Sequence, residues 1–152
     1  MKIIFTDLRA VLLCMSLGAG CGESGPPPFT SGRALLRVGE GIAEVPADTL
    51  NQGRGLFNRN CASCHGYEGR GDGNAARNLA VKPRDFTAAE FLYGSAGAGQ
   101  LPRDGDLKAT IRNGVTTRGM PAWGGMRDAD IDAVVSYIKT FSARWQAPAA
   151  GP

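Results

Sequence analysis

The segment CASCH, residues 61–65, carries the most specific chemistry in this sequence. Cys61 and Cys64 stand three residues apart, so that on one helical turn each thiol can add across one vinyl group of a haem. His65 follows directly, which places an imidazole nitrogen under the haem iron. This pattern predicts a single covalently bound c-type haem, with Cys61 and Cys64 as attachment points and His65 as an iron ligand.

Two other uses of a cysteine pair must be weighed. A structural zinc site needs four protein ligands, usually Cys or His. The chain offers only Cys14 and Cys21 besides the pair, both near its start, and His65 is its one histidine. A redox-active dithiol is typical of a strand–helix–strand unit, and the residues around Cys61 do not show that pattern. Haem attachment is therefore the favoured interpretation.

A second axial ligand for the iron is sought among the methionines. Met120 lies in the segment Gly119-Met120-Pro121, where a glycine with free backbone torsions precedes it and a proline with a fixed φ follows. Such a loop can present a thioether sulfur to the iron. Met126 precedes the last helix and is better suited to packing there. We expect Met120 to be the ligand; the alternative is that it fills a gap in the core.

Helical periodicity predicts the elements that must hold these residues. Helices are expected at about 48–60, from 85 or 87 to 93, at about 105–113, and through the apolar stripe from Ile131 to Phe141. A glycine-rich loop should fill residues 66–84. No strand pattern competes, so the predicted fold class is all-α.

Gly53 inside the first helix costs stability relative to alanine, which suggests the close approach of another element or else simple tolerance. Asp128 is a candidate to cap the last helix.

The start of the chain has the composition of a secretory signal over residues 1–20, with an apolar run too short to cross a membrane. Small residues directly before Cys21 resemble the lipobox of bacterial lipoproteins, so Cys21 is expected to be the lipidated first residue of the mature chain; plain cleavage of the signal without lipidation is the alternative. Residues 21–46 are rich in Pro and Gly and are expected to form a flexible tether, which would reach roughly 25–30 Å. Some of their apolar side chains are able to pack on the domain. Residues 144–152 are expected to form a tail.

The charge balance bears on whether the chain binds nucleic acid. Removing residues 1–20 takes Lys2, Arg9 and Asp7 from 17 basic and 14 acidic side chains, which leaves 15 and 13. A formal charge of +2, before the two haem propionates are counted, gives no indication of nucleic-acid binding.

Taken together, these motifs resemble those of a class I cytochrome c over residues 47–143. The resemblance implies a small all-α cytochrome c fold around one haem, with Gly53 and Phe57 packed near Tyr137. It also implies that the carbonyl of Pro83 accepts a hydrogen bond from the ligand histidine and orients it; ordinary turn formation is the alternative. Further candidates to line the haem or meet its propionates are Trp123, Tyr93 and Arg84.

The expected function is one-electron transfer through a haem c whose iron is ligated by His65 and Met120. We expect an electron carrier rather than an enzyme, a monomer on the periplasmic side of a bacterial envelope, anchored through Cys21 to a membrane. Its redox partners would be a membrane oxidase, reductase or dehydrogenase. One alternative is a cytochrome subunit of such a membrane complex. A gas sensor or peroxidase is a third, and it would need an open iron position.

Overall fold

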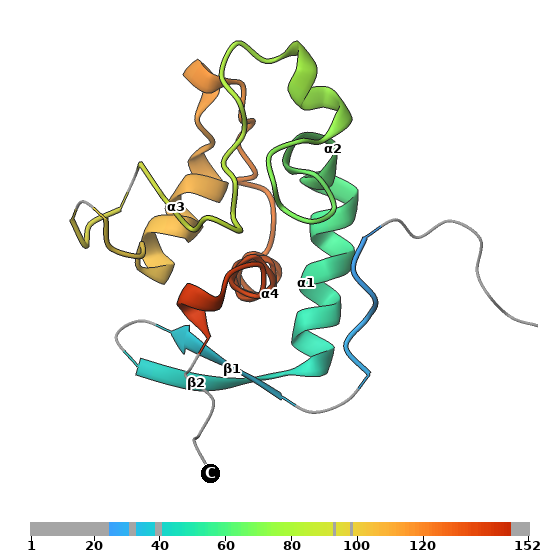
Figure 1. The fold of residues 1–152 in the computed structure, drawn as a ribbon, viewed down its shortest axis with the longest axis vertical. Coiled ribbons are helices and arrows are strands. Elements are labelled where there is room, and N and C mark those ends of the chain that lie inside the picture. Colours follow the sequence, from blue (N-terminus) through green and yellow to red (C-terminus); the bar gives the residue numbers. More distant parts are fainter. Residues whose placement is uncertain (1–24, 31–32, 39–40, 93, 98, 147–152) are drawn as a thin grey trace, which may run out of the picture.

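The computed structural model describes residues 25–30, 33–38, 41–92, 94–97 and 99–146 (Figure 1). The predicted signal segment, Cys21, Tyr93 and the end of the predicted tail lie outside the described residues. Within them, no helix is both long and apolar enough to cross a membrane.

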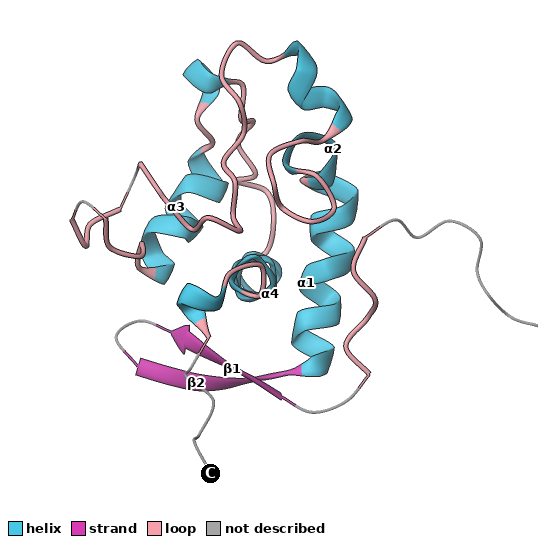
Figure 2. Cartoon of the chain, in the orientation of Figure 1, coloured by secondary structure: helices cyan, strands magenta, loops and turns pink. Residues whose placement is uncertain are grey.

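Two helices that are far apart in the sequence cross at the centre of the molecule. They are α1 (Ala47–Asn60) and α4 (Asp128–Lys139) (Figures 1 and 2). At the crossing, a Cβ atom on Gly53 would lie 2.1 Å from the carbonyl oxygen of Ala133. The glycine is therefore needed for close approach, and both helices are confirmed.

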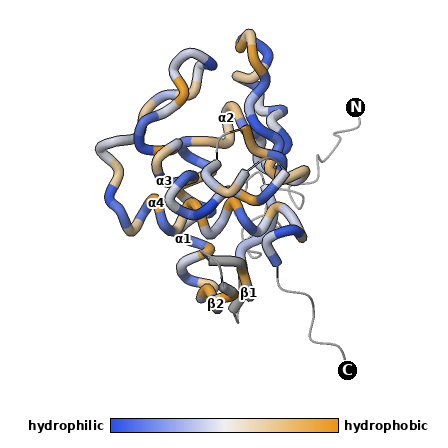
Figure 3. The backbone as a smooth tube through the Cα atoms, turned by 90° about the vertical axis from the view of Figure 1, so that its left-hand side faces the viewer, coloured by the Kyte–Doolittle hydropathy of each residue, from blue (hydrophilic) through white to orange (hydrophobic). Residues whose placement is uncertain are grey.

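The remaining helices complete a mostly helical fold. They are α2 (Ala62–His65), α3 (Asp104–Asn113) and the short 3-10 helices η2 (Asn74–Asn78), η3 (Thr116–Arg118) and η4 (Ala143–Trp145). The third predicted helix is confirmed as α3, which packs on α4. Hydrophobic and hydrophilic segments alternate along the helices in Figure 3, as expected for elements with one buried face.

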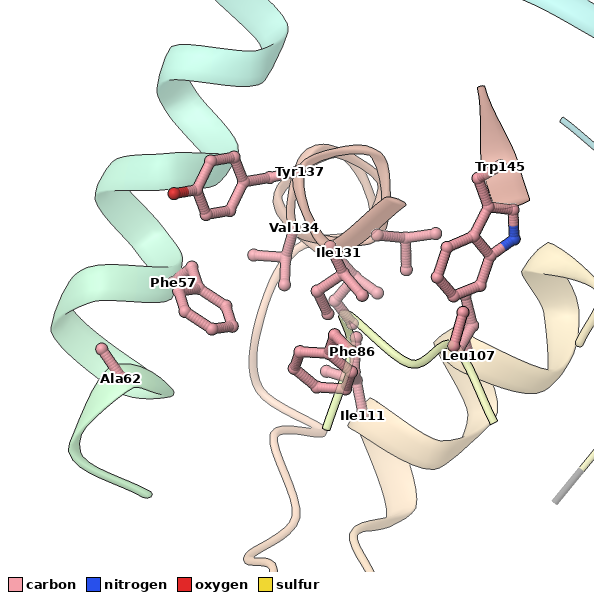
Figure 4. Close-up of a cluster of buried hydrophobic side chains, with 12 residues drawn as sticks. Phe57, Ala62, Phe86, Leu107, Ile111, Ile131, Val134, Tyr137 and Trp145 are labelled. Carbon is pink, nitrogen blue, oxygen red and sulfur yellow. The ribbon is translucent and has the colours of Figure 1, made fainter. Parts of the chain in front are cut away.

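The core consists of large apolar side chains from all parts of the domain. Phe57, Ile131, Tyr137 and Trp145 are each no more than 1 % exposed (Figure 4). Phe57 packs edge-on against Tyr137 with 5.5 Å between ring centroids. The expected tail therefore contributes Trp145 to the core, so the ordered domain extends beyond residue 143.

An antiparallel hairpin precedes α1, and the sequence analysis did not predict it. Strands β1 (Arg33–Val38) and β2 (Gly41–Pro46) pair with Leu36 opposite Ala43. Leu36 and Val45 are buried together with Leu50 in a small second cluster. The expectation of a tether without regular structure is wrong for these residues, because their apolar side chains find a partner surface at the start of α1.

Two local expectations are also wrong. The segment from Asp85 to residue 92 forms a turn instead of a helix: Asp85 Oδ1 accepts hydrogen bonds from Thr87, and Ala89 has a φ of +51°, which a helix does not allow. In α4, Arg127 occupies the N-cap position, and no side chain caps the helix. Its guanidinium instead donates to the carboxylate of Asp130 in the first turn.

Candidate haem-binding site

The cysteine pair lies on a tight turn that continues from the end of α1. The Cys61 N–H donates to the Phe57 carbonyl at 2.8 Å, and the His65 N–H donates to the Cys61 carbonyl at 2.9 Å. Cys61 and Cys64 are both partly buried and form no disulfide. The backbone thus brings two thiols and an imidazole to one short stretch of surface, as the spacing predicts.

A cavity of about 400 Å³ opens beside this turn. Its lining includes Cys61, Cys64, His65 and Met120, and its walls are mostly apolar side chains from α1, α3, α4 and the loops between them. Several of these wall residues are labelled in Figure 4, among them Phe57, Phe86, Leu107, Ile111 and Val134. The two sequence-predicted iron ligands therefore border one apolar space.

His65 is held in one orientation by two contacts. Its Nδ1 lies 3.2 Å from the carbonyl oxygen of Arg84, which can only accept, so Nδ1 carries the proton and Nε2 is left to bind a metal. The ring stacks on Phe86 with 4.5 Å between centroids and 16° between planes. Burial lowers the pKa of His65, which favours the neutral form that a metal ligand needs.

The carbonyl that faces His65 therefore belongs to Arg84 and not to Pro83, contrary to the expected role of the proline. Pro83 does line the cavity. Its carbonyl oxygen lies against Gly71 instead, where a Cβ atom would approach it to 2.4 Å. Gly71 has a φ of +73°, so both its torsion and the close contact require glycine.

Met120 is positioned by a short antiparallel bridge with Val115. The Val115 N–H donates to the Met120 carbonyl at 2.9 Å, and the Met120 N–H donates back at 3.2 Å. Gly119, with a φ of +82°, turns the chain directly before it. Met126 packs against the core but does not border the cavity. The structure thus separates the two methionines in the way expected from their sequence contexts.

The Cys61 thiol is not poised for dithiol chemistry. Burial, and to a lesser extent the neighbouring Cys64, raises the pKa of Cys61 to about 12. A reactive cysteine needs a lowered pKa and a thiolate. The zinc interpretation also finds no support: in the part of the chain that the structure describes, no group of three His, Cys, Asp or Glu side chains is placed to hold a metal ion.

The other candidates are partly supported. Trp123 and Arg84 line the cavity. Sequence reasoning missed Lys82, Arg118 and Phe86, which also border it. None of the described residues in the cavity lining is Asp or Glu, so its charged side chains are basic. In the sequence, the only sign of this basic character was that Lys82 and Arg84 flank Pro83, which was already a candidate site residue.

The donor set fits a haem c. Two thiols can form the thioether bonds, one imidazole and one thioether sulfur can serve as axial ligands, and apolar walls suit the flat macrocycle. Basic side chains at the cavity suit the two propionates.

The sequence matches the family described as cytochrome c oxidase, cbb3-type, subunit III, over residues 48–138. Among curated proteins, it is 36% identical over 102 residues to the cbb3-type cytochrome c oxidase subunit FixP of Azorhizobium caulinodans. That alignment covers 64% of this chain and 29% of FixP.

Among solved structures, the chain resembles one from the Kuenenia stuttgartiensis reducing HAO-like protein complex, with a TM-score of 0.59 and 34% identity. The match covers 66% of this chain and 47% of the other. The chain thus spans less than a third of the curated relative and about half of the solved one.

Proposed function

Because this chain belongs to the family of cbb3-type cytochrome c oxidase subunit III and is a c-type cytochrome with covalently bound haem, we propose that it is a one-electron carrier. The observation that carries the proposal is the apolar cavity bordered by Cys61, Cys64, His65 and Met120. When bound, the haem supplies an iron that cycles between the ferrous and ferric states.

Each of these residues has one task in the proposal. Cys61 and Cys64 fix the haem covalently. His65 ligates the iron through Nε2, and the Arg84 carbonyl sets its tautomer and direction. Met120 is the second axial ligand, held by its backbone bridge to Val115. Pro83 contributes to the cavity wall and rests on Gly71.

Rigid surroundings suit a carrier better than a catalyst. Electron transfer is favoured when little moves as the charge on the site changes. Phe86 is 7 % exposed and stacks on the His65 ring, and Phe57 behind it is fully buried. With both axial positions filled by the protein, no open site is left for a gas or peroxide, which argues against the sensor and peroxidase alternatives.

The relatives' names suggest the setting in which the carrier works. FixP is named as an oxidase subunit, and the solved relative as part of a protein complex. We propose that the chain exchanges electrons with a membrane oxidoreductase, either as a separate monomeric carrier or as a subunit. Co-purification of a partner in a fixed ratio from native membranes would favour the subunit.

The same proposal includes the location. Residues 1–20 have the composition of a signal segment, and Cys21 follows the small residues of a lipobox-like pattern. We place the domain on the periplasmic side of a bacterial envelope, attached to a membrane through a lipid on Cys21.

The ligand set is tested by absorption spectra of the oxidised and reduced protein, made in a host that matures c-type cytochromes. The oxidised protein should show the weak far-red band of sulfur bound to ferric iron. Met120→Ala should lose this band and gain carbon monoxide binding in the ferrous form.

Met126→Ala is the matched control, since Met126 lies outside the cavity, and it should keep the band. Carbon monoxide binding by the unaltered protein would mean that the iron is open, and it would overturn the His65/Met120 ligation.

A further inference from the structure

The segment between the predicted signal and α1 is docked along the domain. Figure 1 shows residues 25–30 lying beside α1 and running in the opposite direction. The Phe29 N–H donates to Asn51 Oδ1 at 2.9 Å, and Asn51 Nδ2 donates to the Phe29 carbonyl at 2.9 Å. The Asn51 side chain of α1 thus satisfies both backbone groups of Phe29, as a neighbouring strand would. Residues 25–30, together with the hairpin that follows them, are called the arm.

Further contacts follow the arm toward the haem-binding end. Arg54 is 7 % exposed, and its Nε donates to the Pro26 carbonyl at 2.9 Å. The Phe29 ring meets Tyr137 of α4 edge-on, with 6.5 Å between centroids. The arm therefore covers the junction of α1 and α4 instead of extending into solvent.

The base of the arm is fixed as well. Leu36 of β1 is 1 % exposed and is bridged to Gln146 near the end of the described chain. Val45 of β2 is buried against Leu50 of α1. The hairpin between residues 25–30 and α1 thus reverses the chain, so that residues 25–30 and α1 run in opposite directions.

The arm ends next to the haem attachment motif. A Cβ atom on Gly25 would lie 3.2 Å from Cβ of Tyr67, two residues after His65, and Gly25 has a φ of +123° that favours glycine. Since α1 is about 20 Å long, the arm carries the chain from one end of this helix to the other.

We propose that the described residues 25–30, 33–38 and 41–46 form a docked arm that delivers the preceding chain to the haem-attachment end of the domain, and so holds that end close to whatever the chain is anchored to. Only residues 22–24 then separate Cys21 from the docked part, a reach of at most about 14 Å. A free tether over residues 21–46 would instead reach roughly 25–30 Å from α1.

The anchoring surface that we favour is a membrane. Tyr67 is 43 % exposed beside the point where the arm ends, and tyrosine is a residue that prefers the membrane–water interface. This part rests on the proposed lipid attachment at Cys21, whereas the path of the arm does not.

The test is the distance between two spin labels in the haem-loaded protein. They are placed at Ser24→Cys and Glu68→Cys, with Cys14 and Cys21 replaced by serine. A docked arm holds the two backbone positions within roughly 13 Å, so that dipolar coupling broadens the spectrum. Phe29→Ala combined with Asn51→Ala should release the arm.

The coupling falls with the cube of the separation, so a release to about 26 Å should weaken it roughly eightfold. Arg59→Ala, an exposed change on α1, is the matched control and should leave the coupling unchanged. A weak dipolar coupling between the two labels that the double variant does not alter would contradict the docked arm. The absorption spectrum of the same samples reports separately on haem binding, and membrane association of the chain with Cys21 intact reports separately on the anchor.

Discussion

Lys139 and Asp104 form an ion pair in which Nζ lies 2.5 Å from Oδ1, while the lysine side chain is only 1 % exposed. The pair joins the end of α4 to the start of α3. Burial lowers the pKa of Lys139, and the Asp104 carboxylate opposes that shift. A charge this deep is stable only with hydrogen-bonding partners, so the pair fixes how α3 sits on the core.

Asp104→Ala should destabilise the haem-loaded protein by about 3–5 kcal/mol, because it removes a carboxylate that compensates a buried ammonium group. Denaturant unfolding measures the change. The second variant, Asp104→Ala with Lys139→Met, should recover most of it. Asp132→Ala is the control, since its ion pair with Lys108 is exposed and should cost no more than about 1 kcal/mol. Equal losses at both sites would contradict the special role of the buried pair.

Gly53→Ala should destabilise the protein although alanine favours helices. The added Cβ would meet a backbone carbonyl of α4 at 2.1 Å, which cannot move without separating the helices, and such overpacking typically costs about 1–3 kcal/mol. Gly105→Ala in α3 meets nothing within 4 Å and should be neutral or stabilising by up to about 1 kcal/mol. Thermal unfolding of both variants measures the difference. Similar melting temperatures for the two variants would show that α1 and α4 do not pack closely at Gly53.

Acid should weaken the contact between α1 and α4 through Asp130. Hydrogen bonds from Arg127, and then from Gln52 at 2.7 Å, hold the pKa of this carboxyl below its ordinary value. Because the folded-state pKa is the lower one, the stabilisation is complete above the unfolded value of about 3.9 and disappears as the pH falls through the folded value.

Asp130→Asn should therefore be less stable than the unaltered protein at pH 7, and the gap should narrow in strong acid. Denaturant midpoints at several pH values test this. Asp132→Asn controls for the change in net charge. A gap that stays constant with pH would exclude the carboxylate as its source.

Cys21→Ser should move the haem protein from the membrane fraction to the soluble fraction if the proposed anchor is correct. Haem absorbance in each fraction measures the distribution. Cys14→Ser lies within the predicted signal and should leave it unchanged. A haem protein that stays with the membrane after Cys21→Ser would point to a bound partner instead.

The haem-free chain should lack a cooperative thermal transition. The cavity of about 400 Å³ lies between α1, α3 and α4, so its apolar walls have no partner when the haem is missing. Calorimetry on chain with Cys61→Ala and Cys64→Ala tests this; a sharp unfolding peak would show that the protein core suffices.

Local signals allowed much of the site and the helices to be predicted. The motif formed by Cys61, Cys64 and His65 lies within five consecutive residues. Periodic apolar side chains indicated α1 and α4, because these side chains form the face of each helix that is buried in the core. The flanking glycine and proline of Met120 indicated the loop that borders the cavity. In each case the information lies within a few residues of the feature.

The features that the sequence did not predict depend on contacts between residues that are far apart in the chain. Trp145 enters the core by stacking edge-on against Phe91, more than fifty residues earlier, which no local pattern reveals. Arg144 donates to the Ala89 carbonyl at 2.7 Å and helps to hold a turn where a helix was expected. The single-residue difference between Pro83 and Arg84 at His65 depends on how the glycine-rich loop bends.

The crossing of α1 and α4 also sets an order of events while the protein is being made. The two helices are separated by more than sixty residues, so the contact between α1 and α4 cannot form until nearly the whole domain is available to fold. In the finished fold both Cys61 and Cys64 are partly buried. Access to the two thiols is thus greatest before the two helices close on each other.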